Sequence, residues 1–203
     1  MNRLTKLAVS CAAMWGFLVA APPSGAQGPL VTATGPEIEA HGGFEFLGQQ
    51  VPGASSVPMY GVDSGLTVGV FRHLGVRLDL GYARANNVFN SGHHSDILSY
   101  MAGPVFYPVG KRHVSPYGEL LLGGARVTGA TPDGQGGFIR GYANQFAWAG
   151  GGGLELRTAR EFSVRVGADY MRTKYFDPNL GLAGQGILRA VVSFTYYLGR
   201  RRR

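Results

Sequence analysis

Residues 188–198 alternate in polarity, and this alternation constrains the fold more than any other feature of the chain. The apolar positions are Leu188, Ala190, Val192, Phe194, Tyr196 and Leu198, with Arg189, Ser193 and Thr195 between them. Successive side chains of a β-strand point to opposite faces, so this segment predicts a strand with one apolar and one polar face. Residues 162–170 repeat the pattern, with Arg165 and Asp169 on the polar side.

The first 26 residues have the composition of a signal peptide. Arg3 and Lys6 precede an apolar run over residues 7–21, and small residues at 24–26 form a site that a signal peptidase reads. The run of about 15 residues is shorter than the ~20 that a membrane-spanning helix needs. We therefore expect residues 1–26 to direct export and to be cleaved after Ala26.

Charge and cysteine content narrow the function classes. The chain has 19 basic and 12 acidic residues, and four of the basic residues form the tail over residues 200–203. No stripe of basic and aromatic residues accompanies this charge, so we expect no nucleic-acid partner. The only cysteine, Cys11, lies in the predicted signal peptide. Without disulfides, stability must come from burial or from closed hydrogen bonding.

After a linker over residues 27–36, the pattern predicts a β-domain over residues 37–199. Its expected strands are Glu37 to Leu47, Ser64 to His73, Val76 to Arg84, Asp96 to Tyr107, Pro116 to Thr128, Gln145 to Arg157, Glu161 to Thr173 and Gly186 to Leu198. These lengths of about 10 to 13 residues match a tilted crossing of a bilayer. The expected fold is all-β: an eight-stranded, antiparallel, up-and-down transmembrane β-barrel.

The connections between the expected strands alternate in length. The long ones are Gly48 to Asp63, Ala85 to Ser95, Gly129 to Asn144 and Lys174 to Gln185. Short turns at one rim and long loops at the other are typical of outer-membrane barrels.

The polar face of these strands is expected to line the lumen. Many glycines share it, which suits a narrow interior crossed by long side chains. Its predicted charge network comprises Glu39, Glu45, Arg77, Asp79, Glu119, Glu155, Arg165, Asp169 and Arg189. Such charges form either a salt-bridge plug or a narrow ion path. Arg126 is an odd number of positions from Glu119 in the same expected strand, so the alternation places it on the opposite, apolar face. This predicts either a bulge in the strand or a position of Arg126 above the membrane.

At this point the chain resembles the small eight-stranded outer-membrane barrels, which include the OmpA transmembrane domain and OmpX-like proteins. The last strand carries the most specific part of the resemblance, with Phe194 and Tyr196 as the spaced aromatics of an assembly signal. This chain then departs by continuing through Leu198 and Gly199 into four arginines. The resemblance implies a monomer in the outer membrane, in contact with membrane lipids and lipopolysaccharide and inserted by the assembly machinery.

Residues 91–95 contain His93 and Ser95, which resemble a fragment of the His-x-Ser motif of outer-membrane lipid A deacylases. The Asn that follows in that family is missing, and the fragment falls in an expected loop. Adjacent His93 and His94 do not converge well on one metal ion. We therefore expect no catalysis, cofactor or metal, and a structural or surface-interaction role through the loops. The alternatives are a lipid-modifying enzyme, a narrow pore, and a soluble exported barrel that binds an apolar ligand.

Overall fold

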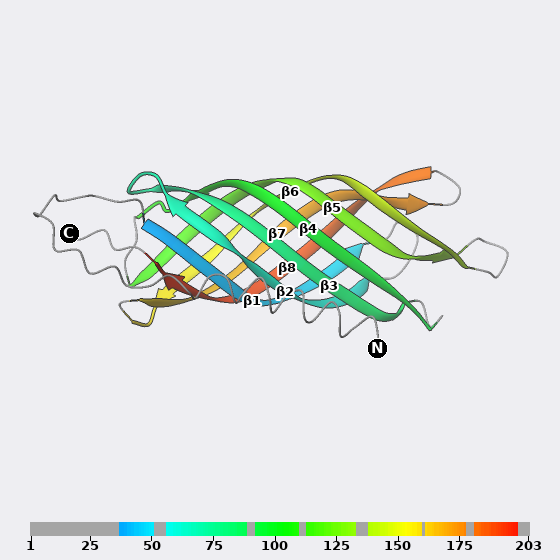
Figure 1. The fold of residues 1–203 in the computed structure, drawn as a ribbon, viewed down its shortest axis with the longest axis horizontal. Helices are drawn as coiled ribbons and strands as arrows, with labels where there is room; N and C mark the ends of the chain where they lie inside the picture. The colour runs from blue at the N-terminus through cyan, green and yellow to red at the C-terminus, as the bar shows by residue number, and fades with distance from the viewer. Residues whose placement is uncertain are drawn as a thin grey trace, which may run out of the picture. The chain divides into compact units, whose positions relative to one another are not determined.

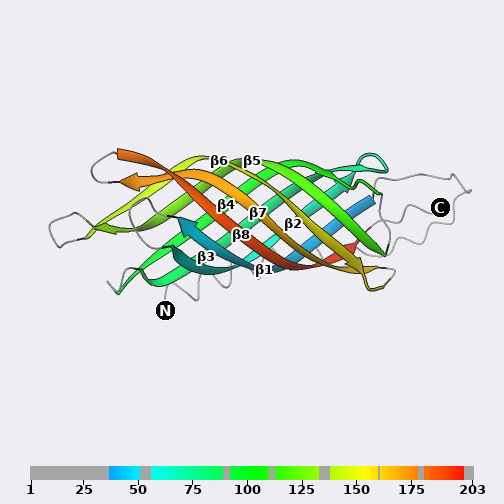
Figure 2. The same cartoon turned by 180° about the vertical axis from the view of Figure 1, so that it is seen from behind.

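The chain folds into a closed barrel of eight antiparallel strands (Figures 1 and 2). The computed structural model describes residues 37–50, 56–88, 92–109, 113–132, 138–159, 161–177 and 181–198. The strands are β1 (Glu37–Gln50), β2 (Val57–Gly69), β3 (Leu74–Val88), β4 (His93–Phe106), β5 (Val114–Pro132), β6 (Phe138–Arg157), β7 (Phe162–Asp177) and β8 (Gly181–Tyr197). Each strand pairs with the next, and β1 pairs with β8, so no edge is left unpaired. The expected fold class is confirmed.

The barrel has two distinct ends. At the turn end, β1 begins, β8 ends, and short connections join β2 to β3, β4 to β5 and β6 to β7. The other four connections lie at the loop end. The predicted signal peptide, the linker and the basic tail fall outside the described residues. No helix long and apolar enough to cross a membrane occurs within the described ranges.

The strands are longer than the sequence pattern predicted. They span 13 residues in β2 to 20 in β6, and β5 and β6 extend farthest at the loop end (Figure 1). Segments expected as loops therefore belong to the barrel wall; Tyr142, for example, still pairs with Thr128. Glycines and polar side chains in these segments resemble loop composition. Backbone hydrogen bonds between strands do not require apolar side chains, however. The strands therefore continue beyond the last residues that alternate in polarity.

The outer face of the barrel carries a continuous apolar band next to the turn end. Large apolar side chains stand exposed on it, among them Phe44 at 71% and Leu122 at 50%. On β6 the band runs from Leu156 to Phe146 and ends at Asn144. These bounds enclose about 11 residues, which is the length of a tilted strand that crosses a bilayer.

Arg126 lies on this outer face, beyond the band. The pairing of β5 with both neighbouring strands keeps one register past this residue, so no bulge changes its direction. Its guanidinium stacks over the ring of Tyr142, 5.2 Å from the centroid. Of the two sequence-based explanations, the bulge is wrong. The register shift in the described sheet lies elsewhere, between Ala85 and Val88 of β3.

The inside of the barrel is divided into two layers. Toward the turn end lies the charged layer, which contains the ionisable residues described below. Toward the loop end lies an apolar layer of buried side chains: Leu47, Met59, Ala83, Ile97, Met101, Leu121, Ala147, Met171 and Ile187. The alternation of polarity predicted a polar lumen throughout. These residues share the strand face of the charged residues, but along the strands they lie closer to the loop end.

Candidate functional site

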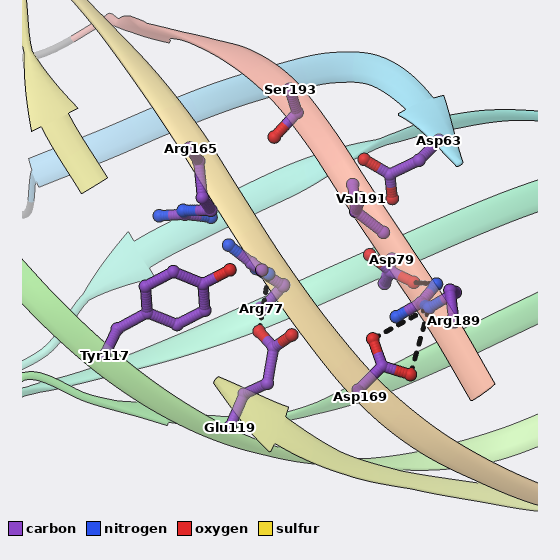
Figure 3. A pocket seen from close by; sticks show the side chains of 11 residues that line it. Asp63, Arg77, Asp79, Tyr117, Glu119, Arg165, Asp169, Arg189, Val191 and Ser193 are labelled. Carbon is purple, nitrogen blue, oxygen red and sulfur yellow. Dashed lines mark hydrogen bonds and ion pairs between the residues drawn. The ribbon is translucent and has the colours of Figure 1, made fainter. Parts of the chain in front are cut away.

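Arg189 on β8 is the centre of the first cluster in the charged layer. Its Nη1 lies 2.8 Å from an oxygen of Asp79 on β3, and its Nε lies 2.8 Å from an oxygen of Asp169 on β7. Glu45 on β1 approaches the same guanidinium at 3.6 Å. Figure 3 shows Arg189 between Asp79 and Asp169. The strand register brings these groups together from four strands, so the cluster links distant parts of the barrel wall.

Arg165 on β7 organises a second cluster, nearer the turn end. Its Nη2 lies 2.9 Å from Glu155 and 3.5 Å from Glu39. The same nitrogen donates a hydrogen bond of 2.9 Å to the hydroxyl of Tyr107, and the hydroxyl of Tyr197 donates to Glu155. Buried guanidinium groups need both opposite charge and hydrogen-bond acceptors, and this cluster supplies both at Nη2.

A third pair completes the charged layer. Arg77 on β3 donates a hydrogen bond of 2.5 Å to Glu119 on β5. The ring of Tyr117 lies between the clusters, with its centroid 5.6 Å from the guanidinium carbon of Arg77 and 4.8 Å from that of Arg165 (Figure 3). Gly167 makes room for this ring, because an added Cβ there would overlap the Tyr117 hydroxyl.

All nine residues of the predicted charge network thus lie on the inner face, in three groups. Two further ionisable residues lie there, both buried: His41 on β1 and Asp63 on β2. The alternation places His41 on the polar face, but the predicted network did not include it. Asp63 was assigned to a loop because β2 was expected to begin only at Ser64. The parity signal was available, since Asp63 has the same parity as Thr67.

The side chains of the charged layer leave little open space among them. A cavity of about 10 Å³ lies among the charged side chains, lined by Asp63, Asp79 and Asp169 among others (Figure 3). That volume admits about one water molecule. On the loop side of this cavity lies the apolar layer, whose side chains Met59, Met171 and Ile187 are each 0% exposed.

The His-x-Ser fragment lies on a strand, which corrects the expectation of an exposed loop. His93 and Ser95 begin β4. Ser95 is buried, and its hydroxyl donates a 3.1 Å hydrogen bond to the backbone oxygen of Thr128. His94 is exposed, and its Nε2 lies 3.7 Å from Asp96. The Ser95 hydroxyl therefore has a structural partner in the β4–β5 wall.

The two aromatic residues of the predicted assembly signal lie on the outer face of β8. Phe194 is 63% exposed and Tyr196 is 39% exposed. The ring of Tyr196 packs against Phe162 with the centroids 5.0 Å apart. Their recognition by an assembly machinery stays a prediction.

No protein-family model matches the sequence, and a comparison with curated proteins finds no match. Solved structures do match. Neisserial surface protein A aligns with a TM-score of 0.59 and 11% identity over 78% of this chain and 96% of its own. Ail, the attachment invasion locus protein of Yersinia pestis, aligns with a TM-score of 0.53 and 18% identity over 80% and 99%. A major outer membrane protein from Thermus thermophilus aligns with a TM-score of 0.52 and 13% identity over 80% and 99%. The chain therefore has the fold of the small eight-stranded outer-membrane β-barrels.

Proposed function

We propose that this protein resides in the bacterial outer membrane as a closed monomeric barrel and presents its loop end to the cell exterior. The observation that carries the proposal is the apolar band, which follows the outer face of all eight strands while the charged groups face inward. Soluble proteins rarely expose a continuous apolar surface of this extent. A soluble barrel that holds an apolar ligand would need the opposite arrangement.

The filled interior favours a closed barrel over the alternative of a narrow pore. An ion would have to pass both the cavity of about 10 Å³ and the apolar layer. An apolar constriction without room for water is a barrier to ions, because an ion loses its hydration there without gaining a partner. The side chains of the interior are thus suited to stiffening the barrel wall.

The test is extraction and reconstitution of the full chain. We expect the protein to need detergent for extraction, to migrate differently on a gel before and after boiling, and to give no steady conductance in planar bilayers. Recovery in the soluble fraction without detergent would contradict the membrane location. A reproducible conductance step would contradict the closed interior and favour the pore.

The outer face beyond the apolar band carries the features expected of a surface that meets anionic groups. Arg126, Arg172 and Lys174 form a cationic collar there, and all three are exposed. Asp96 is the one acidic residue on this outer face among the described residues, and Arg84 lies 3.6 Å from it. Lipopolysaccharide presents phosphates at this level of the outer leaflet, so we propose it as the partner of the cationic collar. A solved structure of Ail holds the heparin analogue sucrose octasulfate, and the collar is suited to a polyanion too.

Replacing Arg126, Arg172 and Lys174 together by glutamine tests this partner. Each cation near an anionic surface contributes about 1 kcal/mol, so the triple variant is expected to lose most of the rise in Tm that lipopolysaccharide gives the parent. Thermal unfolding in micelles, with and without lipopolysaccharide, measures the loss. Arg72→Gln, at an exposed position of the turn end, is the control and should keep the full rise. An unchanged rise in the triple variant would exclude the collar.

A further inference from the structure

The charged layer contains more acidic than basic groups. Seven carboxyl groups, those of Glu39, Glu45, Asp63, Asp79, Glu119, Glu155 and Asp169, share the interior with three guanidinium groups, those of Arg77, Arg165 and Arg189. The ion pairs with arginine described above involve six of these carboxyl groups and do not involve Asp63. Asp63 instead lies beside His41 and Asp79, and its Oδ1 accepts no hydrogen bond. Buried negative charge of this kind calls for a cation.

His41 lies at this point with unused ligand atoms. Its side chain is 2% exposed, and neither ring nitrogen has a hydrogen-bond partner. Its Nε2 lies 3.8 Å from Asp63 Oδ1 and 3.7 Å from Asp79 Oδ1. Both separations are too long for hydrogen bonds. A buried polar ring without partners is costly, and this one faces two carboxylate oxygens.

The spacing of these three atoms suits a bound metal ion. One ligand atom from each residue lies within 4.8 Å of the other two. Zinc–nitrogen and zinc–oxygen bonds of about 2.0–2.2 Å place the ligands of a tetrahedral ion about 3.4 Å apart. The two separations from His41 Nε2, 3.8 Å and 3.7 Å, need to shorten by only a few tenths of an ångström to match. The cavity beside Asp63 and Asp79 offers room for a water as fourth ligand (Figure 3).

Surrounding groups hold the ligands in place. Arg189 binds the other oxygen of Asp79, Oδ2, at 2.8 Å, which leaves Oδ1 directed toward His41. The imidazole lies against the backbone of Gly65, its register partner on β2, where an added Cβ would come within 2.7 Å of the ring. Outer partners that orient a ligand raise metal affinity.

We propose that His41, Asp63 and Asp79 bind a divalent transition-metal ion of the zinc class. One imidazole and two carboxylates suit Zn²⁺, whereas Mg²⁺ and Ca²⁺ prefer oxygen ligands alone. The ion joins β1, β2 and β3 inside the barrel wall and offsets part of the excess negative charge. It is a structural ion, and the site does not depend on the loop-end partner proposed above.

The test uses the untagged chain, refolded into detergent micelles with Zn²⁺ or with a chelator and then freed of unbound metal. We expect about one zinc per chain by elemental analysis, and a higher Tm for the zinc-loaded protein than for the chelator-treated one. Mg²⁺ should leave Tm unchanged. Refolding with zinc admits the ion before the barrel closes, so a parent protein that holds no zinc would overturn the proposal.

Two ligand variants and one control make the assignment specific. Asp63→Asn keeps the size of the side chain and removes its charge, so the barrel should fold while zinc affinity falls at least tenfold. His41→Gln should behave alike. The exposed His94→Gln is the matched control and should bind as the parent does. Zinc retained by both ligand variants, or lost from the control, would place the metal elsewhere and overturn the site.

Discussion

Replacing Arg189 by methionine is expected to lower the free energy of unfolding by about 3–5 kcal/mol, the range for breaking a buried ion pair by removing one partner. Arg189 lies 2.8 Å from both Asp79 and Asp169 and 3.6 Å from Glu45, and its side chain is 2% exposed. Methionine fills much of the same space but donates no hydrogen bond. Three carboxyl groups would then share the lumen without their common cation.

Equilibrium unfolding in urea, with the protein folded in lipid vesicles, measures this loss. Arg172→Met is the control, because Arg172 belongs to the exposed cationic collar; its effect should stay within about 0.5 kcal/mol, as for ordinary surface changes. Equal shifts for the two variants would mean that the Arg189 cluster adds nothing to stability. A double variant that also carries Asp169→Asn should recover part of the lost free energy of unfolding. It removes the charge of one carboxylate that Arg189→Met leaves without its cation.

The alternation of polarity was sufficient to divide each strand into two faces, and the glycines on the polar face indicated that this face lines the lumen. A strand in a barrel wall has only two sides, so a single parity rule places Glu39, Arg165 and Asp169 inside and Phe44 and Val192 outside. The strand number followed from counting repeats, and the alternation of short and long connections indicated an up-and-down barrel. The polarity pattern did not predict where the strands end near the loops: β6 begins at Phe138, seven residues before the expected Gln145. There the outer face has left the apolar band, but the backbone pairing continues.

The grouping of the charges could not be predicted from the sequence. The partners of Arg189 are Asp79, 110 residues away, and Asp169, 20 residues away. Their meeting depends on the register of the whole barrel, which no local pattern encodes. For the same reason, the sequence could not predict that His41, Asp63 and Asp79 come together from three strands. The apolar layer was missed for another reason: Leu47 and Met59 have the parity of the charged residues, and that face was assumed to be polar along its full length.

The second large effect is expected from a charge placed on the apolar band. Val192→Arg should lower the free energy of unfolding in lipid vesicles by about 2–4 kcal/mol, the cost of arginine near the middle of a bilayer on the lipid-facing side of a barrel. Val192 is 46% exposed on the outer face of β8 and pairs with Phe44 and Val166, which are apolar and exposed as well. Urea titration from vesicles measures the change.

Asn144→Arg provides the matched control for Val192→Arg, because it adds the same side chain to the outer face beyond the end of the band. Asn144 accepts a 2.8 Å hydrogen bond from the hydroxyl of Tyr100 at an exposed site, so its loss should cost no more than about 1 kcal/mol. The difference between the two variants isolates the environment of the band from the effect of added charge. A barrel whose outer face met water would tolerate arginine at Val192 as well as at Asn144. Equal stabilities would therefore reject the lipid-facing assignment, whereas a cost confined to Val192 ties the band to the bilayer interior.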